Sequence, residues 1–239
     1  MFKFKVVRNL LIILSFFFFL SLLGACKKGE KAEGIKAVGR TEISCPSGME
    51  VVEIKRAVDG DTVELKTGEI LRYAAINTLE IRTETGVPEP FAKEAYLRNK
   101  ELVEGKKLCL AKNIREKDRF GRLLGELYFP NGTSVSEILV KEGLALCCWF
   151  EGSENIFEKC LPIQRSAIKA RVGLFSLLDK AGPGPYYGNK NSRRFHHPAC
   201  SKDINIKRMV VFKTAEEALL EGYCPVRTCT EYVFGRAEN

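Results

Sequence analysis

The sequence has no apolar run of the length that a membrane-spanning helix needs. Its longest run, Leu10 to Ala25, is shorter than the ~20 apolar residues that cross a bilayer, which argues against a permanent transmembrane helix. Histidine is scarce as well. The sequence has two histidines, and they are neighbours at positions 196 and 197.

Composition excludes a disordered chain. Apolar residues make up 45% and charged residues 28% of the 239 positions, which is typical of folded globular proteins. This length allows one domain of about 130 to 150 residues with appendages. The net charge of +8 favours polyanionic partners, but a charge of this size does not by itself establish one.

The N-terminus predicts export. Basic residues Lys3, Lys5 and Arg8 precede the apolar run, and Leu23-Gly24-Ala25-Cys26 ends it. Small residues directly before a cysteine resemble the bacterial lipoprotein signal, which implies lipidation of Cys26. A simple membrane anchor and a conventional secretory signal are the alternatives. We therefore expect an exported lipoprotein of the bacterial cell envelope, held to a membrane through Cys26, with a signal peptide at 1–25 and a lipidated tether at 26–48.

Export also bears on the remaining cysteines. Eight are left after Cys26, namely Cys45, Cys109, Cys147, Cys148, Cys160, Cys200, Cys224 and Cys229. An even number in an oxidising compartment is compatible with disulfides, although the pairing does not follow from the sequence. Cys109 lies in an apolar, strand-like segment, where a free buried thiol is the alternative.

The periodicity of the central part predicts a small barrel with helices. Strands are expected at Val51–Leu65, broken by the Asp59-Gly60 turn, and at Ile70–Ile76, Leu108–Ala111 and Leu123–Phe129. Helices are expected at Phe91–Glu104, Ser134–Glu142 and Pro162–Val172, each followed by a glycine and the last starting with proline. Five strands in this order, with three helices, match a five-stranded Greek-key barrel of the OB type, a mainly β fold of the α+β class.

Three polar clusters interrupt this pattern. They are Asp59-Gly60-Asp61-Thr62, Arg72 with Asn77-Thr78-Leu79-Glu80, and Asp118-Arg119-Phe120-Gly121-Arg122. Each alone has an ordinary explanation as a hairpin turn, a solvated strand residue or a charged loop. Together they provide oxygen ligands for a hard cation, a carboxylate base and two guanidinium groups that match phosphate oxygens. This set suits hydrolysis of a phosphodiester bond.

The order of the three clusters resembles the staphylococcal nuclease family, and Gly143-Leu144-Ala145 matches a further family motif. The resemblance covers about half the chain. It implies a Ca²⁺ site formed by Asp61, Asn77 and the carbonyl of Thr78. It further implies that Glu80 orients or deprotonates the attacking water, and that Arg72 and Arg122 hold the phosphate.

Two positions depart from the family pattern. Asn77 stands where the family usually has a second metal-binding carboxylate, and Leu79 stands where it usually has proline. Because calcium affinity depends on the charge of the ligands, Asn77 predicts weaker metal binding. Mg²⁺ and Mn²⁺ stay open as alternative ions.

Two further residues are candidates for contact with the nucleic acid. Trp149 lies where the family places an aromatic residue near the nucleotide, which favours base stacking. A single tryptophan is also commonly packed in a core. Arg119 is a candidate for a further phosphate contact.

The C-terminal cysteines and histidines form a separate group. His196, Cys200, Cys224 and Cys229 resemble the short metal-binding segment of the Ada DNA-repair protein, which implies a structural Zn²⁺ site. A disulfide is the alternative. We divide the chain further into a nuclease-like domain at 49–178, a Gly/Pro linker at 179–191 and a small Cys/His module at 192–235.

The sequence therefore predicts a membrane-anchored nuclease that hydrolyses DNA, RNA or both, with Ca²⁺ and little sequence preference. The first alternative is a binding module for single-stranded nucleic acid that has lost turnover through Asn77. The second is a surface interaction protein that acts through its cysteine-rich tail. No protein partner is inferred.

Overall fold

The structure is a computed structural model that describes residues 43–84, 86–200 and 209–235, with the side chains of 114 and 115 left aside. All of them belong to one compact unit, Glu42–Asn239. The predicted signal peptide, the lipidation site Cys26 and most of the tether lie outside the described residues. None of the helices within the described ranges has the length and apolar character to cross a membrane.

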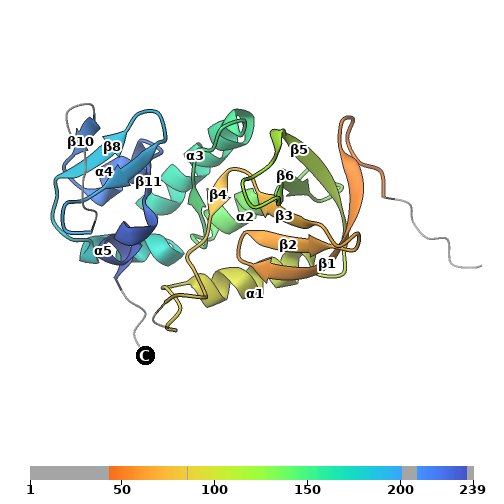
Figure 1. The fold of residues 1–239 in the computed structure, drawn as a ribbon, viewed down its shortest axis with the longest axis horizontal. Coiled ribbons are helices and arrows are strands. Elements are labelled where there is room, and N and C mark those ends of the chain that lie inside the picture. Colours follow the sequence, from red (N-terminus) through yellow and green to blue (C-terminus); the bar gives the residue numbers. More distant parts are fainter. Residues whose placement is uncertain (1–42, 85, 201–208, 236–239) are drawn as a thin grey trace, which may run out of the picture. The chain divides into compact units, whose positions relative to one another are not determined.

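Five strands close into a barrel in the order β1-β2-β3-β6-β5, with β3 and β6 parallel and the other described pairs antiparallel (Figure 1). Their bounds are β1 Glu50–Asp59, β2 Thr62–Leu65, β3 Ile70–Tyr73, β5 Lys107–Lys117 and β6 Leu123–Tyr128. Each strand sends at least one large aliphatic side chain into the core at no more than 1% exposure, including Ile54, Val63, Leu71, Leu110 and Leu127. The predicted α+β fold with a five-stranded barrel is confirmed.

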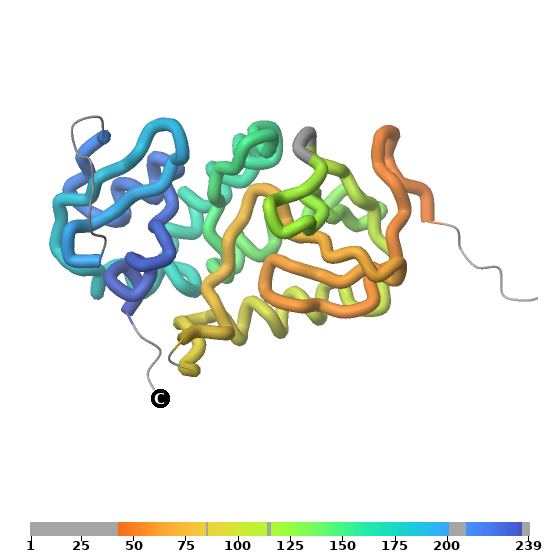
Figure 2. The backbone as a smooth tube through the Cα atoms, viewed as in Figure 1, coloured from red at the N-terminus to blue at the C-terminus, as the bar shows by residue number. Residues whose placement is uncertain are grey.

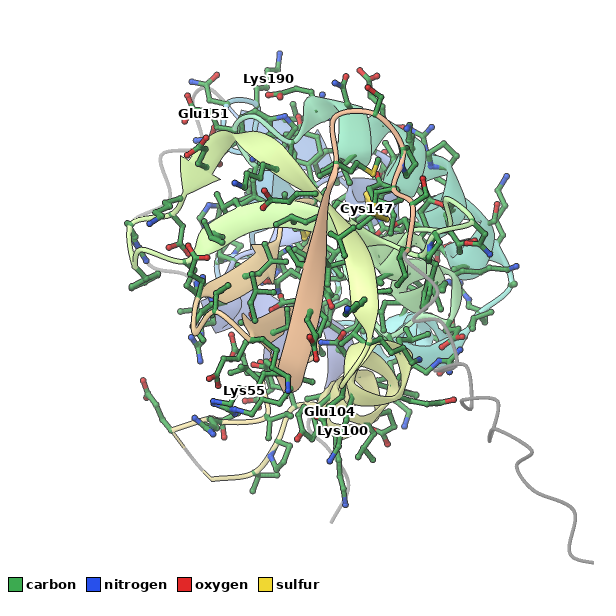
Figure 3. All side chains as sticks on the ribbon, turned by 90° about the vertical axis from the view of Figure 1, so that its right-hand side faces the viewer. Lys55, Lys100, Glu104, Cys147, Glu151 and Lys190 are labelled. Atoms are coloured by element: carbon green, nitrogen blue, oxygen red, sulfur yellow. A yellow bond between two sulfur atoms is a disulfide. The ribbon has the colours of Figure 1, made fainter. Side chains whose placement is uncertain are left out.

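Helices α1 (Ala92–Val103) and α2 (Val135–Lys141) pack on this barrel. At the end of α1 the amide of Gly105 donates to the carbonyl of Ile54 at 3.0 Å. The amide of Ala57 donates to the carboxylate of Glu104 at 3.3 Å, so the helix end is fixed against β1 (Figure 3). Ser134 caps α2, since its side chain accepts from the amide of Glu137.

The third helix differs from its prediction. We expected it to begin at Pro162, but α3 runs from Glu154 to Lys169 and carries Pro162 in its interior. The proline is exposed, and so is Glu158 one turn earlier. Water can therefore hydrate the carbonyl that proline leaves without a donor, while the opposite face of the helix stays buried.

Beyond α3 the chain forms a 3₁₀ segment and a second sheet. The 3₁₀ segment η1 (Gly173–Lys180) leads to a four-stranded sheet in the order β10-β8-β9-β11. The remaining bounds are β8 Tyr186–Asn189, β9 Arg194–His196, β10 Met209–Phe212, α4 Ala215–Leu220, β11 Cys224–Pro225, η3 Arg227–Cys229 and α5 Thr230–Phe234. Strand β8 falls inside the segment that we predicted to be a linker.

A second hydrophobic core joins this sheet to the barrel side of the molecule. Its buried members include Leu146 and Cys148 near the barrel, Phe175 in η1, and Phe195 and Phe234 in the C-terminal segment, which runs from β8 to α5. Figure 2 shows this segment, in shades of blue, next to the green part of the chain that contains α3. Short strands β4 (Ile76–Asn77) and β7 (Leu146–Cys147) pair beside this core. The C-terminal segment is therefore packed onto the rest of this unit through shared apolar contacts.

The eight cysteines of the described residues form four disulfides: Cys45–Cys109, Cys147–Cys160, Cys148–Cys224 and Cys200–Cys229. The free-thiol alternative for Cys109 is therefore wrong. The zinc prediction is also corrected, because Cys224 pairs with Cys148 and Cys200 pairs with Cys229. In the described part of the chain, no three His, Cys, Asp or Glu residues are placed to hold a metal ion.

Candidate active site

The three polar clusters meet in one open pocket of about 760 Å³ at the barrel. Its lining is mostly charged. The residues that form it are Asp59, Asp61, Thr62, Arg72, Asn77, Glu80, Asp118, Arg119, Phe120, Arg122, Leu124, Phe150, Glu151 and Arg227. The predicted site residues Asp61, Arg72, Asn77, Glu80, Arg119 and Arg122 are therefore brought together.

The β1–β2 turn brings the first two clusters into contact. A Cβ atom on Gly60 would lie 2.7 Å from the side chain of Thr78, so this close approach requires glycine. The carboxylate of Asp61 accepts from the backbone amide of Thr78 at 3.3 Å and from the hydroxyl of Thr62 at 2.9 Å. Asp61 is 6% exposed, and these donors satisfy its buried oxygens.

Arg72 on β3 contacts both the backbone that follows this strand and the polar side chains of the site. Its guanidinium donates to the carbonyls of Tyr73 and Ile76 at 2.8 and 3.1 Å, and to the side-chain oxygen of Asn77 at 2.8 Å. The same group lies 3.2 Å from the carboxylate of Asp61. Arg72 is buried, and its Nη1 holds the backbone that leads to Asn77 through the two carbonyls. The predicted phosphate contact therefore shares this side chain with a structural role.

Asn77 and Thr78 also interact with each other. The amide nitrogen of Asn77 donates to the carbonyl of Thr78 at 3.1 Å, which is the carbonyl that the family resemblance assigns to the ion. Thr78 is buried and does not line the pocket. In this arrangement Asn77 contributes an oxygen to Arg72 and a nitrogen to Thr78.

Glu80 lies at the edge of the pocket and is held by its backbone. Its amide donates to the side chain of Glu89 at 2.6 Å, and its carbonyl accepts from the amide of Glu89. The carboxylate is 3.7 Å from the guanidinium of Arg227. Burial, together with Asp59 and Asp61, raises the pKa of Glu80, and Arg227 opposes this shift. The carboxylate of Asp59 likewise has a raised pKa, caused first by burial and in part by Asp61.

The third cluster forms a tight turn between β5 and β6. Asp118 accepts from the backbone amides of Phe120 and Arg122, and its second oxygen accepts from the guanidinium of Arg122 at 2.8 Å. The guanidinium groups of Arg119 and Arg122 both lie over the ring of Phe120, which is 68% exposed. This turn therefore presents two cations and an aromatic ring at one side of the pocket.

The aromatic residue at the site is not the one that we predicted. Trp149 is half-buried against the barrel core and is not among the residues that line the pocket. Its neighbour Phe150 lines the pocket, with the guanidinium of Arg72 4.8 Å from the ring centroid. Arg227, which comes from the C-terminal segment, and Glu151 also line the pocket and were not predicted. Both residues lie well after the three polar clusters in the sequence, so no local pattern indicated that they are close to the pocket.

Comparison with known proteins agrees with this geometry. A family model described as staphylococcal nuclease homologue matches residues 70–177. The chain is 30% identical over 137 residues to an uncharacterized endonuclease of Escherichia coli O157:H7, which corresponds to 54% of this chain and 80% of that protein. The chain belongs to the staphylococcal nuclease family.

Two other members show how the similarity is distributed. The SPbeta prophage-derived endonuclease YokF of Bacillus subtilis is 37% identical over 130 residues, or 52% of this chain and 44% of that protein. The thermonuclease of Staphylococcus hyicus is 26% identical over 175 residues, or 72% of this chain and 98% of that protein. The chain spans less than half the length of YokF, and the family model ends before β8.

The nuclease-family residues present here fit a hard cation in their chemistry. Asp59, Asp61 and Glu80 line one pocket, and burial together with the charges of the neighbouring carboxylates raises the pKa values of Asp59 and Glu80. Clustered carboxylates of this kind, with amide and carbonyl oxygens beside them, are the donor set that Ca²⁺ prefers. Within the described residues the carboxylates alone do not form a metal cluster, so amide or carbonyl oxygens, water or substrate have to complete the coordination.

Proposed function

We propose that this chain is a Ca²⁺-dependent nuclease that hydrolyses phosphodiester bonds of DNA or RNA with little sequence preference. One observation carries the proposal: a single pocket is lined by Asp61, Arg72, Glu80 and Arg122. Membership of the staphylococcal nuclease family supports the same activity.

Each residue has a role that follows from its surroundings. Asp61 and the oxygens of Asn77 and Thr78 would hold the ion, which supplies Lewis-acid polarisation of the phosphoryl oxygen when it is bound. Glu80 would accept a proton from the attacking water, because it is the partly exposed carboxylate beside this group. Arg72 and Arg122 would bind the phosphate and stabilise its growing negative charge.

Low sequence preference follows from the lining of the pocket. Its guanidinium groups match phosphate oxygens, which carry no sequence information. The rings of Phe150 and Phe120 line the same pocket, and stacking on an aromatic ring is open to every base.

The test is cleavage of fluorescent single-stranded DNA, double-stranded DNA and RNA by the oxidised protein lacking only the predicted signal peptide. We expect cleavage with Ca²⁺ and none with chelator. Replacing the base, Glu80→Gln, should lower kcat by about 10²- to 10⁴-fold. Glu94→Gln, an exposed change on α1, is the matched control and should leave the rate unchanged. Equal rates in Glu80→Gln and wild type would disprove the proposed role.

A second candidate function is nucleic-acid binding without turnover. The observation that favours it is the bond from Arg72 to the oxygen of Asn77, which occupies a predicted metal ligand. Asn77→Asp would add the missing negative charge, so under our proposal it lowers the Ca²⁺ concentration needed for half-maximal cleavage. Tight binding of oligonucleotide by the wild-type protein, with no cleavage at millimolar Ca²⁺, would favour the binding function.

We also propose that the protein is exported and anchored through Cys26. The sequence before Cys26 supports this, and four disulfides suit an oxidising compartment. Labelled palmitate should appear in the wild-type protein expressed in bacteria and not in Cys26→Ser. A wild-type protein without label would contradict lipidation.

A further inference from the structure

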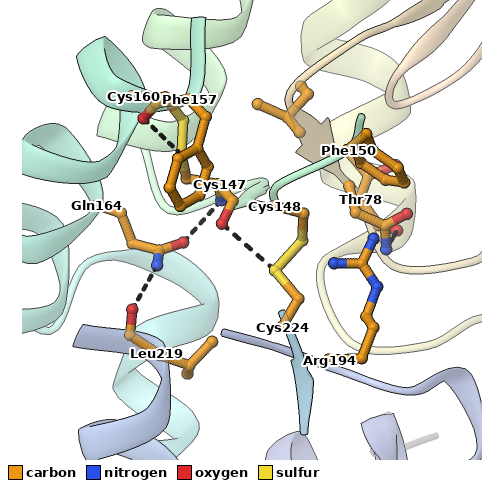
Figure 4. Close-up of a disulfide and its surroundings, with 12 residues drawn as sticks. Thr78, Cys147, Cys148, Phe150, Phe157, Cys160, Gln164, Arg194, Leu219 and Cys224 are labelled. Carbon is orange, nitrogen blue, oxygen red and sulfur yellow. Dashed lines mark hydrogen bonds between the residues drawn. A yellow bond between two sulfur atoms is a disulfide. The ribbon is translucent and has the colours of Figure 1, made fainter. Parts of the chain in front are cut away.

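The C-terminal segment approaches the nuclease pocket at several points, although it lies outside the family match at 70–177. The disulfide Cys148–Cys224 connects it to the residue that directly follows β7, the strand that pairs with β4. Gln164 bridges the two parts, since it accepts from the amide of Cys147 and donates to the carbonyl of Leu219 (Figure 4). The segment is thus fixed beside the site by a covalent bond and by buried hydrogen bonds.

One part of this segment is attached directly to the loop that carries Glu80. The hydroxyl of Thr230 donates to the carboxylate of Glu89, and the other oxygen of Glu89 accepts from the amide of Glu80. The backbone before Thr230 is held as well, because Val226 donates to the carbonyl of Phe195 at 3.0 Å. The position of the backbone at Arg227 is therefore determined by contacts on both sides.

The guanidinium of Arg227 is accessible while its backbone is fixed. It lines the pocket with a side chain that is 68% exposed. Its ion pair with Glu80, at 3.7 Å, is longer than a hydrogen bond. An exposed pair of this kind contributes little to stability. The guanidinium is thus free to exchange this carboxylate for another anion.

The charges of the pocket explain why another anion would be favoured. Five carboxylates and four guanidinium groups line it. Two of the four, Arg72 and Arg122, are paired with Asp61 and Asp118 at 3.2 and 2.7 Å. A polyanionic strand that enters this pocket needs cations that are less committed to carboxylates, and Arg227 is one of them.

We propose that Arg227 binds a phosphate of the substrate strand other than the scissile one, so that the C-terminal segment forms part of the substrate-binding surface. The inference rests on the proposed nuclease function. A planar guanidinium matches two phosphate oxygens at once. From the same segment, Arg194 on β9 places its guanidinium 4.6 Å from the ring centroid of Phe150, which lines the same pocket.

The experiment compares two substrates of different length. One is a single-stranded oligonucleotide, and the other is a p-nitrophenyl phosphodiester of one nucleotide, which contains only the scissile phosphate. Arg227→Ala should raise KM for the oligonucleotide about tenfold and leave kcat/KM for the short ester within about twofold of wild type. The slope of log(kcat/KM) against log[salt] for the oligonucleotide should fall by about 0.7, as expected for one lost contact with a single strand.

Lys213→Ala is the matched control, since Lys213 is an exposed cation of the same segment that does not line the pocket. It should change neither KM nor the salt slope. Arg227→Lys should keep most of the salt slope and recover only part of KM, because an ammonium lacks the paired donors.

Two results would overturn the inference. Equal losses on both substrates would mean that Arg227 acts through Glu80, and no change on either would mean that it does not contact the substrate. If the wild-type protein cleaves nothing, the proposed function fails. Fluorescence anisotropy with a labelled oligonucleotide in chelator then still decides: weaker binding by Arg227→Ala supports the contact, and equal binding refutes it.

Discussion

At the scale of single residues, the two arginines assigned to the phosphate differ in what else they hold. Arg72 is 8% exposed and bonds two carbonyls and an amide oxygen. Arg122 is more accessible, and within the described residues Asp118 is the one carboxylate with which it forms an ion pair. Substitution by lysine should therefore lower both activity and stability at Arg72, but activity alone at Arg122.

We expect Arg72→Lys to lower both cleavage and the free energy of unfolding. A lysine cannot reach all of these acceptors at once, and buried groups left without a partner cost about 1–3 kcal/mol. Arg122→Lys should reduce kcat about 10²-fold and change stability by less than about 1 kcal/mol. Urea unfolding and cleavage assays on both variants measure this. An Arg72→Lys variant as stable as the wild type would show that Arg72 has no structural role.

At the scale of elements, the junction between β6 and α2 contains a buried carboxylate. Glu126 is 0% exposed and accepts from the hydroxyl of Ser134 and from the hydroxyl and amide of Ser136. Burial raises its pKa to about 7, although these hydrogen bonds favour the ionised form. The start of α2 is thus attached to the barrel through a group that titrates near neutral pH.

This junction predicts a pH dependence of stability. The folded protein keeps a proton on Glu126 that the unfolded chain releases near pH 4.5, so the stabilisation is complete below that pH. It is lost as the pH rises through about 7. With about 1.4 kcal/mol per pKa unit, the loss is on the order of 3 kcal/mol. Urea unfolding from pH 5 to 8 should show this decline in wild type and a smaller one in Glu126→Gln. Parallel curves would contradict the assignment.

At the scale of the whole described unit, the C-terminal segment shares a core with α3 and η1. Phe175 and Leu174 from η1 pack with Phe195 and Phe234 from the C-terminal segment, all at 1% exposure or less. The Cys148–Cys224 disulfide closes a loop across this core, and its two cysteines are separated by 76 positions in the sequence. We therefore expect the two parts to unfold together.

Replacing both cysteines, Cys148→Ser with Cys224→Ser, should lower the free energy of unfolding by about 2–5 kcal/mol, since a long loop is no longer closed in the unfolded chain. Trp149 fluorescence reports on the barrel side, and circular dichroism reports on the whole chain. For the wild-type protein, the two signals should change together in a single urea transition. Two separate transitions would instead show that residues 192–235 behave as an independent module.

Much of the site followed from the sequence alone. Strand periodicity and the Asp59-Gly60 turn predicted the barrel, because a two-residue turn and alternating burial are local properties. The clusters around Asp61, Glu80 and Arg122 stood out because charged residues interrupt an apolar pattern. The start of α3 was missed because Pro162 favours a first helical position, and only the exposed face of the folded helix makes an interior proline tolerable.

The sequence by itself therefore determined which chemical groups the protein offers: clustered carboxylate and amide oxygens, arginines beside them, and eight cysteines in addition to Cys26. The tertiary structure decided which of them meet. The pairing of Cys224 with Cys148, the replacement of Trp149 by Phe150 in the pocket, and the contact of Arg227 with Glu80 depend on how the C-terminal segment packs. Packing joins residues far apart along the chain, and no local pattern records that proximity.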